Sequence, residues 1–174
     1  MTLKEQFLSL PPAEKRRVHF VLCAKALAVW LNYSSQKKRS RYVDGVVGLS
    51  HKVDMALPSD AFNAAQEGRD AARVAERYAE PITAMQDDDL EFPRNIEFAY
   101  YSIYNLFCKY VMRDDIDDWI IVNQAISSEP DEPKMFSMFS ETLKPGIEPD
   151  AGANGRPASR FGRSGVTEGP PSVS

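Results

Sequence analysis

The 174-residue chain has little of several features that define functional classes. It has two cysteines and two histidines, and no apolar run approaches the roughly 18 residues that a membrane span needs. Cys23 and Cys108 lie inside apolar helical patterns and are too few for a disulfide framework, so both are predicted to be reduced and buried. Residues Met1 to Leu10 lack the pattern of a secretory signal, and we expect a soluble, cytoplasmic protein.

The common catalytic and nucleotide-binding motifs are also missing. The sequence has no glycine-rich phosphate loop, no Gly-x-Ser-x-Gly elbow and no Cys-x-x-Cys pair. Neither His19 nor His51 has another ligand at a zinc-binding spacing, and His19 is interpreted as a hydrogen-bonded core histidine or a surface one. We therefore predict no catalytic residue, no bound metal and no cofactor.

The net charge of -4 conceals a strong segregation of charge. Met1 to Arg41 holds nine basic residues and two acidic ones, whereas Tyr42 to Lys144 holds nine basic and twenty acidic ones. The basic groups Lys15 to Arg17 and Lys37 to Arg41 flank an apolar helical pattern in a protein that is acidic as a whole. Nucleic acid is therefore not favoured as the partner, and the acidic middle indicates a basic one.

The beginning of the chain has a helical pattern. Thr2 to Glu5 matches a capping box and predicts a short helix to about Leu8. From about Pro12 to Tyr33, apolar residues recur at spacings of three and four, which predicts a long core helix. Its expected buried face consists of Val18, Val21, Leu22, Ala26, Leu27, Trp30 and Leu31.

Two further segments precede the centre of the predicted bundle. Apolar residues between Tyr42 and Leu57 keep a period close to 3.6, which favours a helix, but several are β-branched and glycines intervene, so a strand competes. Pro58 resets the chain, and Ser59 or Asp60 is predicted to cap a small-residue helix that runs to about Pro81.

The strongest helical pattern runs from Asn95 to Met112 and has a wide apolar face, so it is expected at the centre of the bundle. Asp114 or Asp115 is predicted to cap the next helix, and a last short one spans Lys134 to Leu143. Pro145 to Ser174 holds five prolines and six glycines and is predicted to be disordered. The fold class is therefore all-α: one bundle of five or six helices at 1–144, with a disordered tail at 145–174.

Two acidic clusters flank the central helix. Asp114, Asp115, Asp117 and Asp118 place four carboxylates within five residues, and Asp87, Asp88, Asp89 and Glu91 form the second group. Twenty-odd helical residues separate the clusters by roughly 30 Å, so one metal cannot use both. Each cluster is either a solvated helix junction or loop, or a surface for a basic partner; for Asp114 to Asp118 a metal site is a third reading.

The first cluster resembles the Asp-Asp-x-x-Asp motif of prenyl-diphosphate and terpene synthases, through Asp114, Asp115 and Asp118. That resemblance covers five residues and implies a magnesium-dependent enzyme acting on a diphosphate. We keep this function as the alternative. Another reading is a helical scaffold whose tail recruits a further binding partner of unspecified kind.

Aromatic residues supply a possible anchor beside the acids. Most of the aromatic residues in the central helix are expected to pack inward, but Phe98 and Tyr101 fall on a second side that we predict to be exposed. Aromatic rings beside carboxylates are typical of protein-binding surfaces. The predicted partner-binding residues are Asp87, Asp88, Asp89, Glu91, Tyr101, Asp114, Asp115, Asp117 and Asp118.

In style, the chain resembles the helical immunity proteins of bacterial toxin and immunity systems, including those of contact-dependent inhibition. The stretch Glu14 to Tyr33 carries this resemblance, together with the acidic ends of the helix from Asn95 to Met112. The resemblance implies a non-enzymatic cytoplasmic protein that binds a cognate toxin domain, often a basic nuclease, and covers its active site. Complementary charge would speed the encounter, and aromatic anchors would lengthen the residence time.

Overall fold

The computed structural model describes residues 1–36, 41–43, 50–52, 54–68, 73–78 and 92–144. Its helices are α1 (Leu3–Leu8), α2 (Pro12–Ser35), α3 (Leu57–Glu67), α5 (Arg94–Phe107), α6 (Asp118–Ser127) and α7 (Glu132–Thr142), with a π-helical segment η1 (Cys108–Met112) and a helical stretch at 73–78. The predicted all-α bundle is confirmed. The tail at 145–174, predicted to be disordered, lies outside the described residues.

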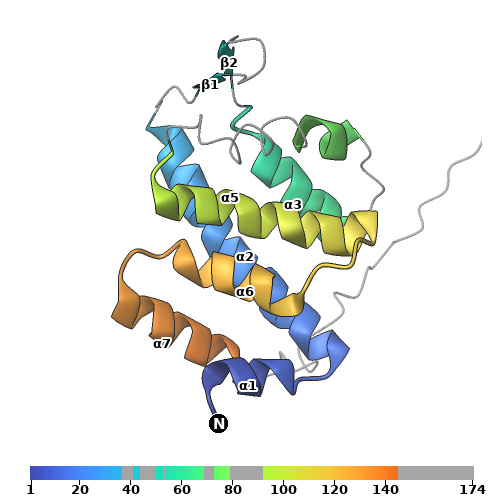
Figure 1. The fold of residues 1–174 in the computed structure, drawn as a ribbon, viewed down its shortest axis with the longest axis vertical. Helices are drawn as coiled ribbons and strands as arrows, with labels where there is room; N and C mark the ends of the chain where they lie inside the picture. Colours follow the sequence, from blue (N-terminus) through green and yellow to red (C-terminus); the bar gives the residue numbers. More distant parts are fainter. Residues whose placement is uncertain (37–40, 44–49, 53, 69–72, 79–91, 145–174) are drawn as a thin grey trace, which may run out of the picture.

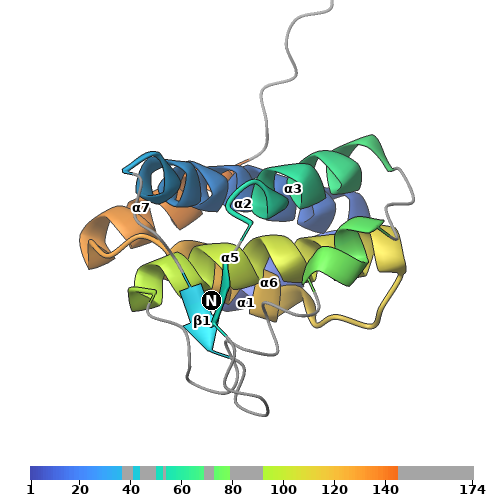
Figure 2. The ribbon, with the colours of Figure 1, turned by 90° about the horizontal axis from the view of Figure 1, so that it is seen from above.

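The helices pack in two layers, with α2 and α3 on one side and α5 and α6 on the other (Figure 2). The long helix α2 crosses behind α5 and α6, while α7 contacts α6 and α2, and α1 contacts α6 (Figure 1). Wide apolar faces drive this arrangement: α5 buries Ile96, Ala99, Tyr100, Ile103, Leu106 and Phe107. The prediction that this helix lies at the centre is confirmed.

The core contains a group of aromatic side chains. Trp30 of α2 is fully buried, lies 5.2 Å from Tyr100 between ring centroids, and donates its indole N–H to the carbonyl of Met55 at 2.9 Å. Such pairs add packing energy beyond the area that they bury.

The free cysteines Cys23 and Cys108 are both buried, as predicted.

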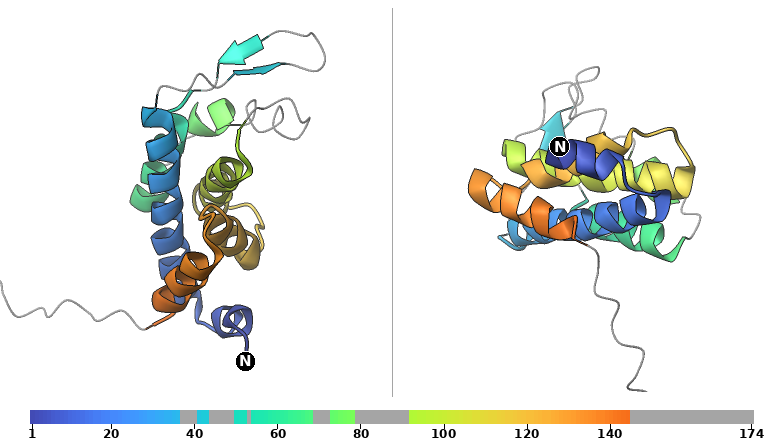
Figure 3. Two further views of the ribbon diagram at one scale, coloured as in Figure 1. Left: turned by 90° about the vertical axis from the view of Figure 1, so that its left-hand side faces the viewer. Right: turned by 90° about the horizontal axis from the view of Figure 1, so that it is seen from below.

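The segment with two competing predictions contains strands rather than a helix. β1 (Arg41–Val43) pairs antiparallel with β2 (Ser50–Lys52), with Tyr42 opposite His51. The prediction of a helix over 42–57 is therefore wrong, and the β-branched residues and glycines of this segment give the physical reason. The pair lies at the end of the bundle opposite the N-terminus (Figure 3).

Other differences from the predictions concern helix ends. The Thr2–Glu5 capping box and α1 are confirmed. The helix predicted to run to Pro81 instead ends at Gly68, which has the left-handed conformation (φ 68°) that glycine adopts at little cost.

Among the helices that the structure describes, none combines the length and the apolar composition that a membrane span requires.

Candidate functional site

The acidic segment from Asp114 to Asp118 forms the junction between η1 and α6. Arg113 ends the π-helix in a left-handed conformation (φ 66°), and Asp117 caps α6, accepting hydrogen bonds from the amides of Trp119 and Ile120. The prediction that Asp114 or Asp115 caps this helix is therefore wrong, because the cap is Asp117, two or three residues later. Asp114 and Asp115 are exposed in the non-helical turn.

Asp118 lies in a half-buried ion-pair network. Its carboxylate lies 3.2 Å from Nζ of Lys15 and 3.0 Å from Nζ of Lys109. These two ion pairs connect the start of α6 to the start of α2 and to η1. Burial opposes ionisation of this carboxyl, but the hydrogen bonds from Lys109 and Lys15 outweigh burial, so its pKa lies below the usual value. The charge of Asp118 is thus compensated internally, and it adds little to an outward-facing acidic surface.

His19 lies beside this network and is fully buried. Its Nε2 lies 2.9 Å from the backbone carbonyl of Asp118, and because a carbonyl only accepts, Nε2 carries the proton. In the neutral ring Nδ1 carries no proton, so it accepts a hydrogen bond from the hydroxyl of Tyr110 at 2.8 Å. Burial, which dominates, lowers the pKa of His19 from 6.5 to about 4. The interpretation of His19 as a hydrogen-bonded core residue is confirmed.

The first basic group, Lys15 to Arg17, is also engaged within the chain. Lys15 pairs with Asp118, and Arg16 lies over the rings of Phe20 and Tyr110 at 4.7 and 4.4 Å. Arg17 pairs with Glu14 of the same helix at 2.8 Å and donates to two backbone carbonyls at the end of α7. Each of these three basic side chains therefore already contacts a carboxylate, an aromatic ring or a backbone carbonyl of the same chain.

The structure does not gather the predicted site residues into one place. Tyr101 is half-buried on α5 and packs edge-on against Tyr100 at 6.4 Å. At 1.5 Å per residue, it lies roughly 18 Å along the helix from the turn that holds Asp114 and Asp115. The second acidic cluster, Asp87, Asp88, Asp89 and Glu91, lies outside the described residues. Within the part of the chain that the structure describes, no group of His, Cys, Asp or Glu is placed to share a metal ion.

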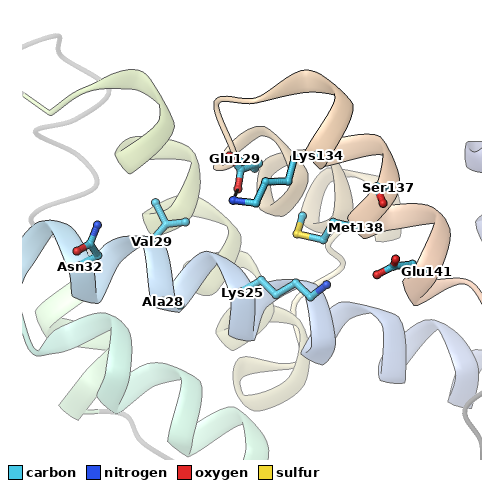
Figure 4. Close-up of a pocket in the computed structure, with 9 residues that line it drawn as sticks. All are labelled: Lys25, Ala28, Val29, Asn32, Glu129, Lys134, Ser137, Met138 and Glu141. Carbon is cyan, nitrogen blue, oxygen red and sulfur yellow. Dashed lines mark ion pairs between the residues drawn. The ribbon is translucent and has the colours of Figure 1, made fainter.

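A groove between α2 and α7 was not predicted from the sequence (Figure 4). It has a volume of about 540 Å³ and an apolar floor of Ala28, Val29 and Met138. Its remaining lining consists of Lys25, Asn32, Glu129, Lys134, Ser137 and Glu141. A second hollow of about 400 Å³ shares Val29, Asn32, Glu129 and Lys134 and extends the groove toward the start of α5.

The face of α2 next to this groove is unexpectedly apolar. Val21 and Leu31 were predicted to be buried, yet they are 37% and 46% exposed. Ala24 and Ala28 are also exposed and lie between them. The prediction failed for Val21 and Leu31 because α2 is apolar around most of its circumference, so spacing alone does not show which side meets the core.

Comparison with known proteins leaves the family of this chain open. No family model matches the sequence, and the searches of curated proteins and of solved structures found no match. A functional assignment must therefore be argued from its own surfaces.

Proposed function

We propose that this protein is a non-enzymatic protein-binding domain that neutralises a basic protein partner, in the manner of helical immunity proteins that inhibit bacterial toxins. One observation carries the proposal: Asp114 and Asp115 stay exposed at the turn after η1, while the nearby lysines Lys15 and Lys109 are both taken by Asp118. In the described residues, neither exposed aspartate has an ion-pair partner.

The turn also offers an apolar contact. Met112, which directly precedes the turn, is 43% exposed, and a flexible thioether adapts to many partner surfaces. The carboxylates would select a basic surface and raise the association rate, while Met112 would bury apolar area once the complex forms. Inhibition by covering an active site needs no chemistry from this chain.

The partner can be sought directly. Tagged protein is incubated with lysate of its own source at low and moderate salt, and the bound proteins are identified by mass spectrometry. We expect one stoichiometric basic protein, whose retention falls as salt rises because exposed charge pairs are screened.

Matched variants then test the surface. Asp114→Lys and Asp115→Lys should each weaken binding of that partner by about tenfold or more, whereas Glu76→Lys, at an exposed position in the 73–78 stretch, should leave it within about twofold. A partner that is acidic, or that binds the two aspartate variants as well as it binds Glu76→Lys, contradicts the proposal.

A further inference from the structure

The helical stretch at 73–78 is attached to the bundle mainly by one buried side chain. Tyr78 is fully buried, whereas every other side chain of the stretch is half-buried or exposed. Its ring packs on the second half of α5, with centroid distances of 5.0 Å to Tyr100, 5.5 Å to Tyr104 and 6.3 Å to Phe107 (Figure 2). Because the stretch is far shorter than the roughly 12 to 15 residues that a helix needs to be stable by itself, it depends on this contact.

This buried side chain carries a polar group that lacks a partner. The hydroxyl of Tyr78 is closed off from solvent and has no hydrogen-bond partner among the described residues. Burial above all, with Tyr100 and Asp60 nearby, raises the pKa of Tyr78 well above its usual value. A buried polar group without a partner keeps its full desolvation cost, and exposure to water removes that cost. The hydroxyl therefore favours an open form of the stretch.

The second attachment of the stretch is a group of ion pairs that solvent reaches. Arg77 contacts the carboxylates of Asp54, just before α3, and Asp60, in the first turn of α3. All three side chains are more than one-third exposed. Ion pairs at such positions are screened by salt and contribute little to stability. The stretch is thus closed by one aromatic contact and by ion pairs that salt weakens.

The two cysteines lie at different depths relative to this stretch. The Cys108 thiol is close enough to the Tyr78 hydroxyl to contribute to the raised pKa of that group, so both side chains face the same part of the interior. Cys23 is fully buried between α2 and α5, where its thiol lies 3.6 Å from the carbonyl of Ser102. Cys108 therefore reports on the edge that the stretch covers, and Cys23 reports on the centre of the bundle.

We infer that the 73–78 stretch is a latch that opens while the bundle stays folded, and that its opening uncovers the Cys108 thiol and the rings of α5 that pack on Tyr78. A segment with one buried side chain and solvent-exposed polar contacts opens at a lower free energy than the core does. The ion pairs of Arg77 make this opening sensitive to salt. The inference concerns the free chain and does not depend on the proposed partner.

Thiol labelling of the folded full chain at increasing urea concentrations tests the inference. Peptide mass spectrometry assigns the label to Cys23 or to Cys108. A local opening exposes little surface, so labelling through it depends weakly on urea, whereas labelling through global unfolding depends steeply on urea. Without urea, Cys108 should react at least about tenfold faster than Cys23, and its rate should rise less steeply with urea. Equal rates with equal urea dependence overturn the inference, and this comparison needs no variant.

Variants of the stretch show whether the latch is the part that opens. Tyr78→Phe keeps the ring and removes the hydroxyl that lacks a partner, so it should slow the labelling of Cys108 by about fivefold or more. Arg77→Gln removes the ion pairs, so it should speed that labelling by about two- to fivefold and abolish its increase with sodium chloride. Arg73→Gln removes an exposed cation from the same stretch and should change the rate by less than about twofold.

Two results with these variants contradict the latch. Faster labelling of Tyr78→Phe means that the hydroxyl has a hydrogen-bond partner in the closed form, and it overturns the inference. An Arg77→Gln variant with the rate and the salt dependence of the wild type also overturns it. The unfolding temperature of each variant shows whether it folds.

Discussion

The hydroxyl of Tyr110 donates a hydrogen bond to Nδ1 of His19 across 2.8 Å, although the two residues are 91 positions apart in the chain. The other ring nitrogen donates to a backbone carbonyl, so a second proton on the ring would turn Nδ1 from an acceptor into a donor and would reverse the direction of this hydrogen bond. The contact therefore ties the packing of α2 against η1 to the protonation of one side chain.

Acidification should destabilise the protein through His19. The unfolded chain takes up a proton at this residue near pH 6.5, but the folded chain does so only near pH 4. Between these values the unfolded state binds more protons, so the free energy of unfolding falls as the pH falls, by at most about 3 kcal/mol from this group. Urea titrations of wild type and His19→Gln check this: the stability advantage of wild type should shrink from pH 6.5 to pH 4. A constant difference would show that His19 does not titrate in this way.

Asp118 should matter more for stability than its exposed neighbour Asp115. Asp118→Asn removes the charged partner of both Lys15 and Lys109 and should lower the free energy of unfolding by about 1 to 2 kcal/mol. Asp115→Asn removes the same charge from an exposed site and should change stability by less than about 0.5 kcal/mol. Equal effects in chemical denaturation would mean that the network contributes little.

Asp117 should stabilise α6 as its N-cap. Asp117→Ala leaves the amides of Trp119 and Ile120 without their carboxylate acceptor and should cost about 1 kcal/mol. Asp114→Ala, three residues earlier and outside the cap, is the matched control. Thermal unfolding followed by circular dichroism measures both variants, and a larger loss for Asp114→Ala would contradict the assignment of the cap.

The two cysteines should react slowly in the folded protein. Burial raises the pKa of the Cys23 thiol to about 12 and that of the Cys108 thiol to about 11, so little thiolate is present at pH 8. A colorimetric thiol reagent should modify both only as fast as the chain opens, and immediately in urea. Fast labelling of either thiol under native conditions would show that the interior is open there.

Magnesium should not stabilise the protein. A diphosphate-binding metal centre would need Asp114, Asp115 and Asp118 together, but Asp118 is held by two lysines. We expect millimolar magnesium chloride to leave the unfolding temperature within about 1 °C of a matched sodium chloride control. A clear increase, lost in Asp114→Asn, would favour the enzyme alternative.

The sequence predicted those parts of the fold that depend on local chemistry. The α1 capping box needs only Thr2 and Glu5, and the wide apolar face of α5 left one choice for the bundle centre. The prediction from sequence failed where two local signals conflict. Between Tyr42 and Leu57, a helical period competed with β-branched residues and glycines, and pairing between Arg41 and Lys52 decided the outcome.

The candidate site was harder to predict because it depends on contacts between distant segments. In the sequence Asp118 is one of four equivalent carboxylates, and only the fold brings Lys15, more than a hundred positions earlier, beside it. The exposure of Val21 and Leu31 on α2 was missed for a related reason: the sequence of a helix that is apolar all round does not show which side the rest of the chain leaves uncovered.

The guanidinium of Arg17 donates to the carbonyls of Thr142 and Lys144 and fastens the end of α7 to the start of α2. The end of α7 is thereby held at the end of the bundle where α1 begins (Figure 1). A fluorophore attached near Met1 and one attached on the last turn of α7 would therefore report on the same end of the bundle. A fluorophore on β1 or β2 would report on the opposite end.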